Sequence, residues 1–117
     1  MYNIFFIKNK KKELLGKKVF LRYPEIKDWK EWAELRQMSR KFLQPWEPRW
    51  PKNYLTKDFF EQFVNDTNVS IKNKTSYTFF IFHHISRALV GGINLTNIKN
   101  KLYKSITIGY WMGINFA

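Results

Sequence analysis

Hydrophobic positions follow two different periods along this chain. Apolar residues recur at three-to-four spacing over residues 26–38 and 57–67, which predicts two amphipathic helices. Apolar runs or alternating patterns over residues 17–23, 77–83, 87–96 and 102–111 predict four strands. The order is strand, helix, loop, helix and three successive strands. This order predicts an α+β domain in which helices cover a mainly antiparallel sheet.

The last predicted strand has the clearest alternation. Ile106, Ile108 and Tyr110 fall on one face, and smaller or polar residues fall on the other. This pattern is typical of a half-buried strand. Short polar breaks at residues 84–86 and 97–101 separate the three strands and favour a meander.

The segments between these elements carry capping and breaking signals. Asp28 and Thr56 are suited to cap the two helices. Residues 39–56 are expected to form a loop because prolines stand at every third position from 45 to 51. That loop is rich in aromatic residues, so it either packs over the core or lines a pocket. Residues 65–76 are polar and are expected to form a surface loop.

Composition narrows the class of protein. With 117 residues, 44% hydrophobic and 19% aromatic, the chain favours one packed domain, preceded by a lead-in segment at residues 1–16. The absence of cysteine excludes disulfides and a thiol nucleophile. No apolar run approaches the roughly 20 residues of a membrane-spanning helix, and the start lacks signal-peptide features. We therefore expect a soluble cytoplasmic protein without a membrane partner.

The net charge of +12 raises the question of nucleic-acid binding. Only five of the 21 basic residues are arginine, the side chain best suited to bidentate phosphate and base contacts. We therefore do not expect nucleic acid as a specific ligand.

Few residues carry obvious chemistry. His83 and His84 are adjacent and would point to opposite faces of a strand, so no metal site is expected. Gly91 and Gly92 lie in a strand pattern and indicate a bulge or a close approach of another group. Glu47 stands between Trp46 and Pro48; desolvation there would suit it to act as a general base. The alternative is a surface carboxylate paired with Arg49.

Several motifs together resemble a known family. The segments are LRYPEIKDWKEWAELRQMSRKFLQPWEPRWP (residues 21–51), FFIF (79–82), LVGGINLTNI (89–98) and IGYWMGINFA (108–117). They resemble, in order and spacing, the RimJ/RimL branch of the GNAT acetyltransferases, which acetylate the N-termini of ribosomal proteins. The resemblance covers residues 17–117, which would form a partial GNAT domain.

This resemblance implies acetyl-CoA as the donor and an amine or protein N-terminus as the acceptor, including a ribosomal protein. It implies direct attack by the neutral amine on the thioester. Gly109, Tyr110, Trp111 and Met112 would present backbone groups to acetyl-CoA. Trp46 and Asn94 would contact the acceptor, and Glu47 is the candidate catalytic base.

The sequence departs from the family at its end. A Gly-rich pyrophosphate loop, which opens a helix in the family, is expected directly after WMGINFA, but the chain ends at Ala117. We therefore expect the N-terminal half of a GNAT fold, truncated before that loop and inactive alone. The alternatives are a basic accessory domain that binds ribosome or RNA, and a split enzyme whose other half is a second polypeptide.

Overall fold

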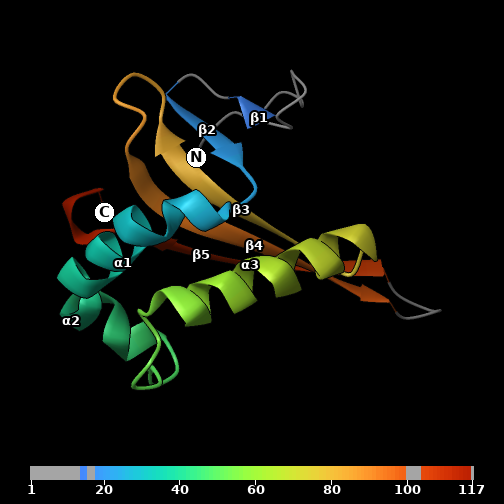
Figure 1. The fold of residues 1–117 in the computed structure, drawn as a ribbon. Coiled ribbons are helices and arrows are strands. Elements are labelled where there is room, and N and C mark those ends of the chain that lie inside the picture. Colours follow the sequence, from blue (N-terminus) through green and yellow to red (C-terminus); the bar gives the residue numbers. More distant parts are fainter. Residues whose placement is uncertain (1–13, 16–17, 100–103, 117) are drawn as a thin grey trace.

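The computed structural model describes residues 14–15, 18–99 and 104–116 (Figure 1). One antiparallel sheet has the strand order β1-β2-β3-β4-β5. The strands are β1 (Leu14–Leu15), β2 (Val19–Arg22), β3 (Ser76–His83), β4 (Leu89–Lys99) and β5 (Lys104–Met112). The predicted α+β class and the meander are confirmed. The predicted lead-in at residues 1–16 falls almost wholly outside the described residues.

Three α-helices lie over one face of this sheet (Figure 1). They are α1 (Trp29–Met38), α2 (Arg40–Leu43) and α3 (Lys57–Lys72), with 3-10 turns η1 (Ile26–Asp28), η2 (Gln44–Trp46) and η3 (Ile114–Phe116). The main core forms where α1 and α3 meet β2 and β3. Its buried residues are Phe20, Trp32, Leu35, Phe60, Val64, Phe80, Phe82 and Leu89.

The opposite face of the sheet carries a second buried cluster. It consists of Val19, Leu21, Phe79, Ile81 and Val90. Successive strand residues point to opposite faces, so burial of both clusters explains why β2 and β3 are apolar almost throughout.

The two long helices begin near the predicted positions, but their caps differ. Thr56 Oγ1 accepts a hydrogen bond from the Phe59 amide at 3.3 Å, as predicted for an N-cap. Asp28 does not cap α1 with its side chain. Its carboxylate instead accepts two hydrogen bonds from Arg22, at 2.7 and 2.8 Å, and one from the Glu25 amide. Asp28 therefore joins β2 to the turn before α1.

Two predicted loops are partly helical. The segment 39–56 contains α2 and η2, because the three prolines begin only at Pro45 and leave residues 40–43 free to continue a helix. Helix α3 continues to Lys72, five residues beyond the predicted end, and Ser70 and Ile71 in this extension are half-buried. Tertiary packing overrides the weak helix propensity of the polar residues there.

The prediction of a half-buried last strand was wrong for β5. Ile106, Ile108 and Tyr110 are 65%, 63% and 76% exposed. Ile108 pairs with Leu95 and Tyr110 with Ile93, so these side chains of the outer strand lie on the face opposite the helices, beside the second cluster, and no described helix packs there (Figure 1). Alternation in the sequence identifies which side chains share a face, but not whether another element covers that face.

The glycine pair in β4 marks a bulge and allows one close approach. The register shifts beside Gly91, where Ile81 pairs with Gly91 but Phe82 pairs with Leu89. A Cβ atom on Gly92 would lie 2.5 Å from Nε1 of Trp111, so the missing side chain makes room for this indole. The prediction of a bulge or close approach is confirmed. No helix in the described part of the chain is long and apolar enough to cross a membrane.

Candidate functional site

One cavity lies between the helices and the sheet. Its volume is about 470 Å³. Helix α1 contributes Trp32 and Arg36 to the wall, and the loop before α3 contributes Glu47, Pro48 and Tyr54. The floor comes from β3, β4 and β5, and apolar surface predominates. This combination of an aromatic wall with a few charged groups is typical of a ligand site.

Arg36 is the central polar residue of this cavity. Only 3% of Arg36 is exposed, yet its guanidinium donates to both carboxylate oxygens of Glu47, at 2.6 and 3.0 Å. It also donates to the hydroxyl of Tyr54 at 2.9 Å. Its Cζ lies 4.6 Å from the ring centroid of Trp111 and 4.8 Å from that of Trp50, within cation–π range. Arg36 thus joins α1, the loop and β5.

Glu47 is held on two sides. Besides the bidentate pair with Arg36, its Oε1 accepts a hydrogen bond from Nε1 of Trp50 at 3.0 Å. The side chain is 21% exposed and remains accessible from the cavity. Its ion-pair partner is therefore Arg36 and not Arg49. An ionised carboxylate can accept about four hydrogen bonds, so one position on Oε2 stays available for a ligand.

Tyr54 supplies a second polar group to the cavity. Burial raises the pKa of its phenol above the ordinary value of 10.0; the nearby Arg36 guanidinium opposes this rise and Glu47 adds to it. The phenol is therefore neutral near pH 7 and can donate a hydrogen bond to a ligand while accepting one from Arg36. Its ring also packs against Trp32 and Trp50.

The sheet brings several residues from the sequence prediction to this cavity. Gly109, Tyr110 and Trp111 of β5 line it together with Asn94 of β4, and Asn94 pairs with Gly109 across the two strands. The Asn94 Oδ1 atom accepts a hydrogen bond from Oγ1 of Thr78 at 3.1 Å. A Cβ atom on Gly109 would meet nothing within 4 Å, so this part of β5 borders open space.

Two predicted site residues lie elsewhere. Trp46 is 84% exposed and does not line the cavity, where Pro48 and Tyr54 form the loop side of the wall. Met112 packs against the second apolar cluster on the opposite face of the sheet. Only its backbone could therefore face a ligand that lies along β5.

Sequence reasoning missed the role of Arg36. A signal was present, because Arg36 follows Leu35 on the apolar stripe of α1, where a charged residue is unexpected. A buried arginine requires an anion and hydrogen-bond partners, and the nearby aromatic loop contains one carboxylate, Glu47. The apolar stripe therefore indicated that Arg36 needs a carboxylate partner. The loop conformation that brings Glu47 to Arg36 was not predictable from residue spacing.

Two hydrogen bonds fix α1 relative to the strands that form the cavity. Glu31 accepts one from the Leu89 amide at 2.8 Å, at the start of β4. Ser39, fully buried at the end of α1, accepts one from the Ile114 amide at 2.9 Å. Figure 1 shows the segment after β5 beside α1, in agreement with this bond. The helix that carries Arg36 is therefore anchored at both of its ends.

Comparison with solved structures identifies the fold. The ribosomal-protein-S5-alanine acetyltransferase of Vibrio fischeri superposes with a TM-score of 0.77 at 17% identity, over 89% of this chain and 57% of that one. Mycobacterium smegmatis RimJ, solved with CoA-disulfide, gives 0.74 at 22% identity, over 84% and 47%. The microcin C7 self-immunity acetyltransferase MccE, solved with acetyl-CoA and AMP, gives 0.65 at 25% identity, over 86% and 53%.

The chain has the fold of the N-terminal half of a GNAT acetyltransferase. It spans about half the length of the solved structures that it matches. No family model and no curated protein matches the sequence. Within this GNAT fold, the Arg36–Glu47 pair and β5 line one cavity, and the sequence prediction of the fold is confirmed.

Proposed function

We propose that this chain forms the acceptor side of an N-acetyltransferase of the RimJ/RimL type, which transfers an acetyl group from acetyl-CoA to a protein N-terminus or another amine. The observation that carries the proposal is a single cavity that joins a paired carboxylate, Glu47, to the β5 residues 109–111. The similar structures include ribosomal-protein acetyltransferases and a protein solved with acetyl-CoA, which supports this reading.

The acceptor amine would enter the aromatic part of the cavity. An α-amino group has an ordinary pKa of about 7.7–8.0 and must be neutral to attack a thioester. An apolar environment disfavours the ammonium form, so Trp32 and Tyr54 would promote its deprotonation. Glu47 would hold the incoming ammonium and accept its proton, while Arg36 fixes the orientation of the carboxylate.

Acetyl-CoA, when bound, supplies the thioester. Gly109, Tyr110, Trp111 and Met112 would hold it along β5 through backbone groups, because Gly109 borders open space and the outer edge of β5 has no partner strand in the described sheet. Asn94 would contact the acceptor beside this strand.

Residues 1–117 match only about half of each similar structure, so we expect acetyl transfer to need the region that they do not match, whether it belongs to the same polypeptide or to another. The donor site can still be tested on the chain itself. Isotope-labelled protein would be titrated with acetyl-CoA, with ATP as a control polyphosphate.

The proposal predicts weak binding, with amide shifts concentrated at residues 109–112 and absent with ATP. Shifts confined to lysine-rich segments and identical for both compounds would contradict it and would favour a basic accessory domain. A transfer assay with a protein that also contains the unmatched region would follow by mass spectrometry, with peptides that have free N-termini. Acetylation is expected at the N-terminal amine and should fall strongly in Glu47→Gln.

A further inference from the structure

A second, more polar pocket lies next to the candidate acceptor cavity. Its volume is about 460 Å³, and it is lined by Arg40, Gln44, Glu47, Arg49 and Trp50. Glu47 lines both this pocket and the larger cavity. A ligand that extends from the cavity past Glu47 would therefore reach two arginine side chains.

These two arginines have no carboxylate partner in the part of the chain that the structure describes. The ion pairs there join Arg22 to Glu25 and Asp28, Lys27 to Glu25, and Arg36 to Glu47. Because Arg36 already neutralises Glu47, the pocket carries a positive excess from Arg40 and Arg49. A guanidinium binds carboxylate groups in a bidentate manner, so the pocket is suited to an acidic side chain.

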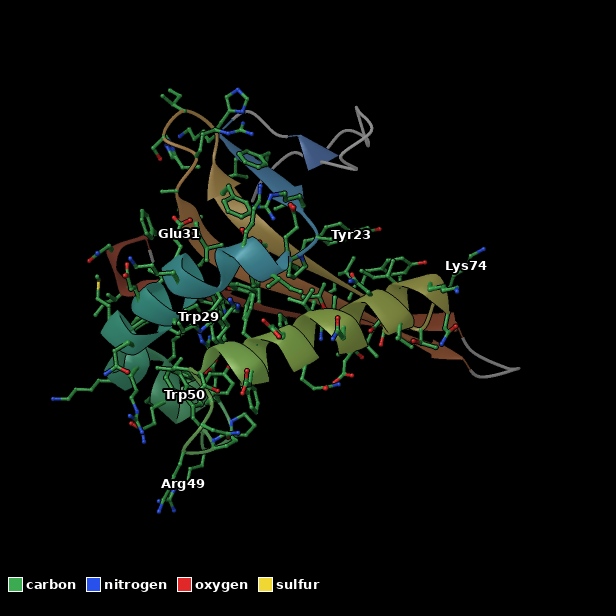
Figure 2. All side chains as sticks on the ribbon, viewed as in Figure 1. Tyr23, Trp29, Glu31, Arg49, Trp50 and Lys74 are labelled. Carbon is green, nitrogen blue, oxygen red and sulfur yellow. The ribbon has the colours of Figure 1, made fainter. Side chains whose placement is uncertain are left out.

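The pocket is also partly pre-organised. The Cζ atom of Arg40 lies 5.5 Å from the ring centroid of Trp50. Trp50 itself is fixed by its hydrogen bond to Glu47 and by the ring of Tyr54, whose centroid is 4.9 Å away. Figure 2 shows Trp50 beside the helices and Arg49 extending outward from the loop. Arg40 is therefore oriented by Trp50, whereas Arg49 extends outward from the loop (Figure 2).

An acidic peptide fits this pocket better than RNA does. Proteins that bind single-stranded RNA combine a positively charged groove with aromatic faces on which the bases stack. The only aromatic residue in the pocket is Trp50, and its ring is already contacted by Arg36, Arg40 and Tyr54. A carboxylate needs no such face, because it requires only the guanidinium groups.

We propose that the Arg40–Arg49 pocket selects acceptors that carry an acidic side chain shortly after the N-terminal residue. This inference rests on the proposed function, since it assumes that the acceptor N-terminus occupies the neighbouring cavity. It adds a specificity determinant: Glu47 and Tyr54 receive the amine, while Arg40 and Arg49 recognise the charge that follows it.

The test measures peptide binding and needs no acetyl-CoA, so its outcome is independent of the donor titration. Two fluorescent peptides with free N-termini would differ only in having glutamate or lysine at the second and third positions. Binding would be measured by anisotropy at low salt for the wild-type protein and for the double variant Arg40→Gln, Arg49→Gln. The control variant, Lys72→Gln with Lys74→Asn, removes the same charge at the far end of α3, where Figure 2 shows Lys74.

The glutamate peptide should bind the wild type more tightly than the lysine peptide, and the arginine double variant should weaken its binding about fivefold, as expected for two exposed charge pairs. The control variant should retain the preference. Charge reversal by Arg40→Glu, Arg49→Glu should invert the preference toward the lysine peptide.

Three results would overturn the inference. The first is equal binding of both peptides, or no binding of either. The second is an equal loss in the arginine and lysine variants, which would indicate an effect of net charge alone. The third is a loss of poly(U) binding in the arginine variant with unchanged peptide binding, which would assign the pocket to RNA.

Discussion

Replacing Glu47 by glutamine tests whether the Arg36–Glu47 pair holds the candidate site together. Glutamine has nearly the same shape but no charge, and it offers one carbonyl oxygen where the carboxylate offers two. Arg36 is 3% exposed and donates to both oxygens. In the variant, one of these donors would face an amide NH₂ group, and the guanidinium charge would lose its anion.

The expected loss follows from the burial of both partners. Breaking a buried ion pair by removing one partner destabilises a protein by about 3–5 kcal/mol. Because Glu47 is 21% exposed and glutamine retains one acceptor, we expect a smaller loss, within the range for hydrogen bonds to charged groups, of about 2–3 kcal/mol. For a domain of this size that corresponds to a fall in Tm of about 10 °C.

Thermal unfolding followed by circular dichroism would measure the change. Glu34→Gln is the matched control, since Glu34 is exposed on α1, the helix that also carries Arg36. We expect the control to melt within about 2 °C of the wild type, as is usual for surface substitutions. If Glu47→Gln melted at the same temperature as this control, the pair would not stabilise the fold and the reasoning would be refuted.

Three further predictions concern the surroundings of this pair. Gly92→Ala should displace the Trp111 indole and destabilise the fold by about 1–3 kcal/mol in urea unfolding, and an unchanged midpoint would contradict the close packing. Ser39→Ala should speed hydrogen exchange of the Ile114 amide and lower stability by about 1 kcal/mol; unaltered exchange would mean that the bond is not formed. The raised pKa of Tyr54 contributes stability that is fully present below pH 10.0 and is lost as the pH rises through the pKa of the folded state. The variant Tyr54→Phe should therefore lose less stability than the wild type above pH 10.0. Equal losses in both proteins would contradict a raised pKa for Tyr54.

The fold was largely predictable because the hydrophobic periodicity agreed with tertiary packing. The stripe of Phe59, Phe60, Phe63 and Val64 predicted α3, and Thr56 marked its start. Its extension to Lys72 was not predictable, since residues 68–72 are polar or weak helix formers. Helix α2 was not predicted, because the prolines were taken to break the whole loop although they lie only in its second half.

The candidate site was predictable only in part. Glu47 was identified because it is a carboxylate among aromatic residues, and the cavity does contain it. The alternative interpretation paired it with Arg49, two residues away, but the loop folds back so that Arg36 of α1 reaches it. Trp46 was an obvious aromatic candidate, yet the η2 turn exposes it to solvent. Local sequence does not encode which side of a loop faces a helix.

The most direct test of the account is whether the cavity distinguishes a free amine from an acetylated one. The indole N–H of Trp50 donates to Glu47, so its NMR signal reports on that carboxylate, and the signal of Trp111 reports on β5. We expect a peptide with a free N-terminus to shift both signals and the same peptide with an acetylated N-terminus to shift neither. Equal shifts with both peptides, or no shift with either, would contradict an amine acceptor site at Glu47.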